Sequence, residues 1–114
     1  MVEFVRLDMY QGANFNFDLE FPDGFLVSTM SFEMQIREQE SRGSVLILDV
    51  TPYINVILED NKVSINVPFT VIEGLSFNKG FYDIFVSNSD NNDRFPLFKG
   101  VVVFDSQVTY DGGV

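Results

Sequence analysis

Two eight-residue segments, residues 14–21 and 30–37, alternate polar and apolar residues without a break. Successive side chains of a β-strand point to opposite faces of its sheet, so this alternation buries one face and leaves the other in water. The pattern predicts antiparallel strands that a second sheet covers on one side. The residues predicted to face that second sheet are Phe15, Phe17, Leu19, Phe21, Met30, Phe32, Met34 and Ile36.

Residues 80–104 predict a hairpin at the centre of the fold. Its first half repeats the alternation, with Tyr82 and Ile84 on one face, and residues 94–104 supply a second, apolar strand. The residues that connect the two strands, 88–93, are all Asn, Ser or Asp. Side chains of these types bond to their own backbone and favour turns.

Shorter apolar segments complete the predicted sheet structure. Further strands are predicted at residues 2–10, 45–50, 54–58 and 63–67, with one turn of helix at residues 71–74. About seven to eight short strands separated by turns, without alternating helices, are typical of an antiparallel sandwich or barrel. We predict one all-β domain over residues 1–104 and a polar tail over residues 105–114, from 114 residues of which 46% are hydrophobic and 13 are Phe.

The residue types that the chain lacks restrict its chemistry. It has no Cys, His or Trp, which excludes disulfides, thiolate metal sites, and catalytic Ser-His-Asp or Cys-His arrangements. An enzyme of this composition would depend on carboxylates, and the candidates Asp18, Glu20, Glu33, Glu59 and Asp60 lie at predicted polar faces or turns. A solvated surface explains them better. We therefore predict no enzyme activity, no catalytic residue and no cofactor.

One acidic turn resembles a cation site in composition. Residues 89–93, Ser-Asp-Asn-Asn-Asp, offer clustered oxygen atoms of the kind that Ca²⁺ binds. The segment lacks the glycine and the distal glutamate of an EF-hand, and a hairpin turn accounts for it. We predict no metal site.

The net charge of −10 restricts the partners. Nucleic acid and anionic membranes repel such a surface, because both are bound through Lys and Arg. The first residues do not form a signal peptide, and no apolar run is long enough to span a membrane. A protein partner is the remaining expectation.

Tyr82 stands near the start of a central strand, where a buried hydroxyl bonds to upstream backbone in the tyrosine corner of sandwich folds. We predict that structural role for it. The central hairpin has apolar residues on both faces, and a surplus of this kind indicates burial against another chain. The predicted interface residues are Phe81, Phe85, Val102, Phe104, Tyr10 and Tyr110.

The order and spacing of several short motifs resemble a small immunoglobulin-like (Ig-like) domain of tailed-bacteriophage virion proteins. That domain occurs at the N-terminus of baseplate upper proteins and in stand-alone relatives. The segments that carry the resemblance are residues 11–15 (QGANF), 34–37 (MQIR), 63–67 (VSINV), 79–84 (KGFYDI), 98–103 (FKGVVV) and 108–109 (VT). The resemblance implies an antiparallel Ig-like β-sandwich that is a structural part of a virion.

From this resemblance we expect a non-enzymatic structural protein of a phage particle, made in the host cytoplasm and located in the virion. The expected role is a tail or baseplate adaptor that docks other virion proteins, as a homo-oligomer or singly, through residues 1–10 and 105–114 and its apolar patches. A capsid decoration protein is the first alternative. A carbohydrate-binding module for a host surface, with exposed aromatic residues along a groove, is the second.

Overall fold

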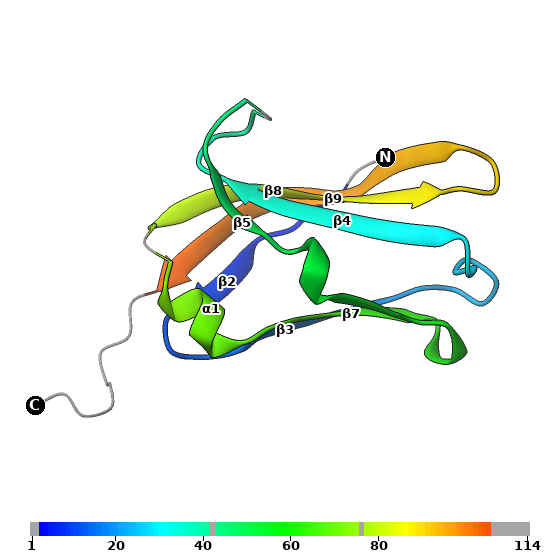
Figure 1. The fold of residues 1–114 in the computed structure, drawn as a ribbon, viewed down its shortest axis with the longest axis horizontal. Coiled ribbons are helices and arrows are strands. Elements are labelled where there is room, and N and C mark those ends of the chain that lie inside the picture. Colours follow the sequence, from blue (N-terminus) through cyan, green and yellow to red (C-terminus); the bar gives the residue numbers. More distant parts are fainter. Residues whose placement is uncertain (1–2, 42, 76, 106–114) are drawn as a thin grey trace, which may run out of the picture.

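The computed structural model describes residues 3–41, 43–75 and 77–105. They form two packed sheets, seen edge-on in Figure 1. The elements are β1 (Glu3–Phe4), β2 (Leu7–Tyr10), β3 (Phe15–Glu20), β4 (Met30–Arg37), β5 (Leu46–Asp49), η1 (Thr51–Tyr53), β6 (Ile54–Ile57), η2 (Leu58–Asp60), β7 (Lys62–Val67), α1 (Phe69–Glu73), β8 (Lys79–Asn88) and β9 (Asp93–Asp105).

The larger sheet has six strands in the order β1-β9-β8-β4-β5, with β2 also paired to β9, and the smaller sheet has the order β3-β7-β6. The predicted all-β sandwich is therefore confirmed, and most predicted strands match within a few residues. The predicted central hairpin is present as β8 and β9, which pair antiparallel over most of their length. The predicted tail, residues 105–114, lies outside the described residues except for Asp105, which ends β9.

One edge of the larger sheet differs from the antiparallel prediction. Strands β1 and β2 both run parallel to β9, with Phe4 opposite Lys99 and Leu7 opposite Val102. The two short strands keep one register, but the predicted single strand is interrupted between them at Val5 and Arg6. At the interruption the Val5 backbone bonds to β9 and to the Tyr82 side chain of β8.

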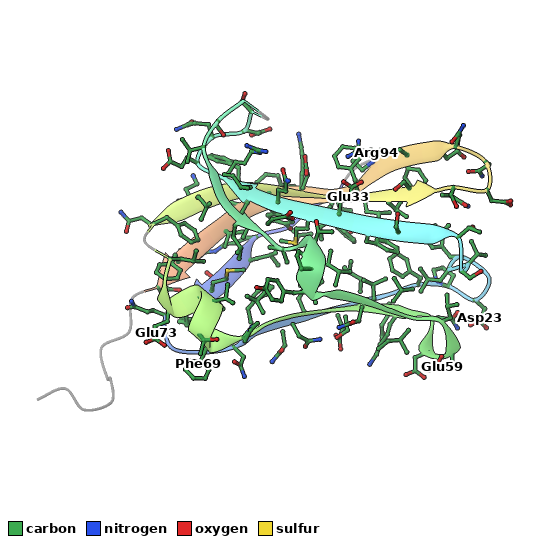
Figure 2. The ribbon with its side chains drawn as sticks, in the orientation of Figure 1. Asp23, Glu33, Glu59, Phe69, Glu73 and Arg94 are labelled. Carbon is green, nitrogen blue, oxygen red and sulfur yellow. The ribbon has the colours of Figure 1, made fainter. Side chains whose placement is uncertain are left out.

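The core lies between the sheets and has the composition that the alternation predicts. Apolar residues from both sheets and from α1 fill it, and no polar or charged residue among those described is buried. Figure 2 shows these side chains in the space between the two layers. The side chains with almost no exposed surface are Met9, Met34, Ile36, Val50, Val63, Ile65, Val67, Ile72, Ile84, Val86 and Val102.

The chain passes from the larger sheet to the smaller one through η1. Val50 is fully buried before it, and the amide of Val50 donates to the carbonyl of Met34 at 2.9 Å. The Thr51 hydroxyl accepts from the Met34 amide at 3.1 Å and lies 3.3 Å from the Met34 carbonyl. These bonds satisfy the backbone of β4 at the point where β5 turns away from it.

The N-terminal segment approaches β9 at unusually close range where Val5 passes Gly100. A Cβ atom on Gly100 would lie 2.8 Å from the carbonyl carbon of Val5, and closer still to its oxygen. The Val5 amide donates to the Lys99 carbonyl at 2.9 Å, and the Val5 carbonyl accepts from the Tyr82 hydroxyl at 2.7 Å. Tyr82 and Gly100 are opposite each other in the β8–β9 pair. Gly100 therefore makes the space through which the Tyr82 hydroxyl reaches Val5.

The prediction for Tyr82 is thus confirmed in its main point. The side chain is buried and its hydroxyl bonds to backbone. The acceptor, however, lies on the parallel edge segment and not a few residues upstream in the chain, as in a tyrosine corner.

Replacing Gly100 with Ala should destabilise the domain, because the added methyl group would overlap the Val5 backbone, which cannot rotate away as a side chain can. We expect a loss of about 1–3 kcal/mol in the free energy of unfolding, measured by urea denaturation. The control is Gly43→Ala, where the nearest atom to the new methyl group is the Ser41 hydroxyl oxygen at 3.8 Å. Equal stability of the two variants would contradict the close approach of the Val5 backbone to Gly100.

Replacing Tyr82 with Phe should cost about 1 kcal/mol near neutral pH, because the Val5 carbonyl loses its donor. Burial raises the pKa of Tyr82 from 10.0 to about 12, so the unfolded chain releases this proton before the folded protein does. Stability from Tyr82 is complete below pH 10, and it is lost as pH rises toward 12. The stability advantage of the parent protein over Tyr82→Phe should therefore shrink between pH 10 and pH 12 in urea titrations. A constant difference would contradict the burial of this hydroxyl.

Candidate functional site

The outer face of the larger sheet is built around three alternate residues of β8. Phe81, Asp83 and Phe85 point away from the core, because Tyr82 and Ile84 between them are buried. Register adds the neighbouring side chains of this face. The rows across β4, β8 and β9 are Arg37–Phe81–Val101, Gln35–Asp83–Lys99 and Glu33–Phe85–Pro96.

Cations cover both phenyl rings. The Lys79 ammonium lies 5.3 Å from the centroid of the Phe81 ring, and the Arg94 guanidinium lies 4.1 Å from the centroid of the Phe85 ring. Both contacts are within cation–π range. Arg94 also pairs with Glu33, with Nε and Oε1 3.5 Å apart, and Figure 2 shows these two side chains together on the outer side of the larger sheet.

Asp83 is the acid at the centre of this face. Partial burial raises the pKa of its carboxyl above the usual range, while the nearby charges of Arg94 and Arg37 act in the opposite direction. The two guanidinium groups belong to different strands, β9 and β4, on either side of β8. Positive charge therefore converges on Asp83 from both sides.

A cleft of about 700 Å³ lies on this face. Its floor includes Phe81, Asp83 and Phe85, and Arg37, Arg94 and Lys99 line its sides. The chain between β4 and β5 rises above the sheet beside it (Figure 1) and contributes residues 39–41, while Phe4 of β1 lines it from the other edge. The Lys99 ammonium and the Glu40 carboxylate lie 3.6 Å apart and join this wall to β9.

The outer face of the smaller sheet has a different character. Asp18 accepts from the Ser64 hydroxyl at 2.7 Å and lies 3.8 Å from the Lys62 ammonium, and Asn66 donates to the Ser64 hydroxyl at 3.0 Å. This polar network suits a solvated surface. The aromatic residues that face outward from the strands of the two sheets therefore gather on the larger one.

The predicted interface residues fall into three groups. Phe81 and Phe85 line the cleft, and Tyr10 is 56% exposed on the same outer face of the sheet edge. Val102 is fully buried in the core, so it is not available to a partner. Phe104 shares the core-facing side and stacks on Phe77, with ring centroids 4.8 Å apart. Tyr110 lies outside the described residues.

The register of β9 determines which of its residues face the core. Val102 is opposite Gly80 on the core-facing side of the β8–β9 pair, where it is fully buried. The outward positions are Val101 and Val103, both half-buried. The prediction of Val102 and Phe104 as interface residues was wrong about the side they face, because residues 101–104 are all apolar and show no alternation.

The predicted turn after β8 is held by its own side chains. The Asn88 side-chain oxygen accepts from the Asp90 amide at 3.0 Å, and the Asn91 side-chain oxygen accepts from the Asp93 amide at 3.1 Å. Asn92 has a positive φ of 60°, which asparagine tolerates well. Within the described ranges, no group of three or more acidic residues is placed to bind a metal ion. No helix in that part of the chain is long and apolar enough to cross a membrane.

Comparison with known proteins identifies the fold. The natural killer cell receptor NKp44, a triggering partner in natural cytotoxicity, matches with a TM-score of 0.54 at 8% identity, over 90% of this chain and 99% of that chain. The fold is immunoglobulin-like. The extracellular domain of the voltage-gated sodium channel β4 subunit, whose parallel homodimers are described as explaining cell–cell adhesion, matches with a TM-score of 0.52 at 15% identity, over 95% of this chain and 96% of that chain. Neither a protein-family model nor the sequence of a curated protein matches this chain.

The Ig-like core is built here without its usual covalent link. In antibody domains a disulfide joins the sheets against a Trp, and a Tyr stands two residues before the second Cys. Ile84 occupies the position two residues after Tyr82, and it is 1% exposed. Because the chain has neither Cys nor Trp, apolar contact alone joins its sheets at this point.

The opposite orientations of Val101 and Val102 can be tested by matched truncation. Val102→Ala should lower the free energy of unfolding by roughly 2 kcal/mol, because it leaves a cavity in the core. Val101→Ala, one residue away on the outer face, should cost less than half as much. Chemical denaturation of both variants measures the difference, and a larger loss for Val101→Ala would reverse the assignment of the faces.

Proposed function

We propose that this chain is a non-enzymatic docking domain and a structural component of a tailed-phage particle, in the role of a tail or baseplate adaptor. The observation that carries the docking role is the outer face of the larger sheet, where Phe81 and Phe85 line a cleft. A domain of this size needs only one apolar face per sheet for its own core. The two phenyl rings on the outward face of β8 are therefore available for contact with another protein.

The phage assignment rests on the resemblance of the sequence motifs to virion Ig-like domains. Several of these motifs supply structural features described above: the segment at residues 98–103 contains Gly100, and the segment at residues 79–84 contains Gly80 and Tyr82. Assembly in a particle would place several copies by symmetry, including contact between copies. The homodimers named for the sodium channel β4 domain illustrate such self-contact on the same fold.

A carbohydrate-binding role has less support from the cleft. Sugar recognition by stacking needs a free aromatic face. Here Lys79 lies over the Phe81 ring and Arg94 lies over the Phe85 ring. The cations also make these rings part of a charged surface, which suits a protein partner better.

Quantitative mass spectrometry of purified phage particles tests the proposal. We expect the protein at a small fraction of the copy number of the major shell protein, as for a tail or baseplate component. Near-equal copy number would instead identify a capsid decoration protein. Absence from the particles would overturn the virion proposal.

The docking face is tested in the same particles with a paired design. Phe81→Thr/Phe85→Thr keeps β-forming residues while removing both rings, and should reduce incorporation at least severalfold because the contact area is lost. Asn16→Ser/Asn66→Ser changes the outer face of the smaller sheet and serves as the control. Equal incorporation of the two variants would place the contact elsewhere.

A further inference from the structure

The cleft on the larger sheet differs in charge from the rest of the molecule. Arg37, Arg94 and Lys99 line it with only Glu40 and Asp83 as acids, so its lining carries +1. The whole chain carries −10, which leaves −11 for the remainder. Four of the seven Lys and Arg residues, including Lys79 beside the cleft, project from this one face.

The existing ion pairs show which group these cations accept. The Lys99 ammonium meets the Glu40 carboxylate of the β4–β5 connection at 3.6 Å, and Arg94 meets Glu33 at 3.5 Å. In each pair both side chains are more than half exposed. Such exposed ion pairs contribute little to stability, so their partners are readily replaced. A carboxylate from another chain can therefore replace Glu40 or Glu33 at small cost.

Hydrogen bonds hold the Arg37 guanidinium in place beside the cleft. Its guanidinium donates to the Ser44 carbonyl at 2.7 Å and to the Gln35 side-chain oxygen at 2.9 Å. Both acceptors are neutral, so the charge of Arg37 is not cancelled by the groups that orient it. Arg37 and Arg94 act on Asp83 from opposite sides, and Asp83 is the acid that a guest carboxylate would have to displace or approach.

We propose that this cleft binds an extended acidic segment of a partner protein, with carboxylates against Arg37, Arg94 and Lys99 and apolar contact with the rings of Phe81 and Phe85 on either side of Asp83. The proposal rests on the docking function above and names the chemistry of the partner. The volume of about 700 Å³ suits a few residues of extended chain. A second copy of this chain is less favoured, because two bodies of charge −10 repel each other.

The test uses the whole protein and a short capped peptide of Glu and Ser with one central Phe. Amide chemical shifts are followed by NMR at about 150 mM salt, where the screening length is about 8 Å. This salt weakens the repulsion between the peptide and distant acidic residues more than it weakens contacts in the cleft. We expect shifts centred on Arg37, Asp83 and Lys99, and none there with a peptide in which Lys replaces every Glu. Absence of shifts with the Glu peptide would overturn the proposal.

Two double variants of equal charge separate the cleft from the overall charge. Arg37→Gln/Arg94→Gln should weaken peptide binding roughly fivefold or more, whereas Arg6→Gln/Lys62→Gln, outside the cleft, should leave it within about twofold. Both variants carry the same net charge as each other. Equal weakening would attribute binding to overall charge and contradict the proposal.

Asp83→Asn supplies a test that misfolding cannot imitate. Removing the acid at the centre should tighten binding of the Glu peptide about two- to fivefold, because Arg37 and Arg94 lose their competing carboxylate. Weaker binding by this variant would count against the proposal. Shifts of the cleft amides that grow with protein concentration alone would identify a second copy as the occupant and also overturn it. Peptide binding does not require presence in particles, so this proposal and the virion proposal fail separately.

Discussion

The contact of Val5 with Gly100 and Tyr82 joins the N-terminal segment to the central hairpin of the larger sheet. The absent side chain of Gly100 lets the N-terminal segment approach β9, and the Tyr82 hydroxyl, which comes from the neighbouring strand β8, binds the Val5 carbonyl. The N-terminal segment is thus joined at one point to the β8–β9 hairpin, which lies far from it in the sequence. Because the core-facing and outward positions of β8 alternate on either side of Tyr82, the same contact determines which residues form the outer face.

The two faces of the larger sheet divide the work of the domain. Its inner face joins the core, where residues such as Met34 and Ile84 pack without a disulfide. Its outer face holds aromatic rings under cations, arranged around Asp83. The smaller sheet has a polar outer face and serves mainly to cover the core. One sheet is therefore exposed to two environments, and β8 and β9 carry apolar residues on both sides, whereas the outward residues of β4 are polar.

Much of the fold could be predicted from alternation alone, because a strand with one wet face leaves a period of two in the sequence. The segments at residues 14–21 and 30–37 are the best examples, and both lie where predicted. Alternation could not orient β9, because a strand that is apolar on both faces has no period of two. Val102 was therefore predicted to face outward, although Val101 is the residue that does so. The cleft could not be predicted from alternation either. Its cations, Arg37, Arg94 and Lys99, are brought beside Phe81 and Phe85 only by the register of three strands.

The break between β1 and β2 has a consequence for solubility. A free sheet edge is a template on which strands of other molecules add, and proteins suppress this by keeping their edges short and irregular. Here the edge strands of the larger sheet have two, four and four residues. At the break, the Val5 amide and carbonyl are both already bonded within the domain, to Lys99 and Tyr82. The close contact of Val5 with β9 and Tyr82 therefore also leaves no free backbone group at Val5 on which a strand of another molecule could add.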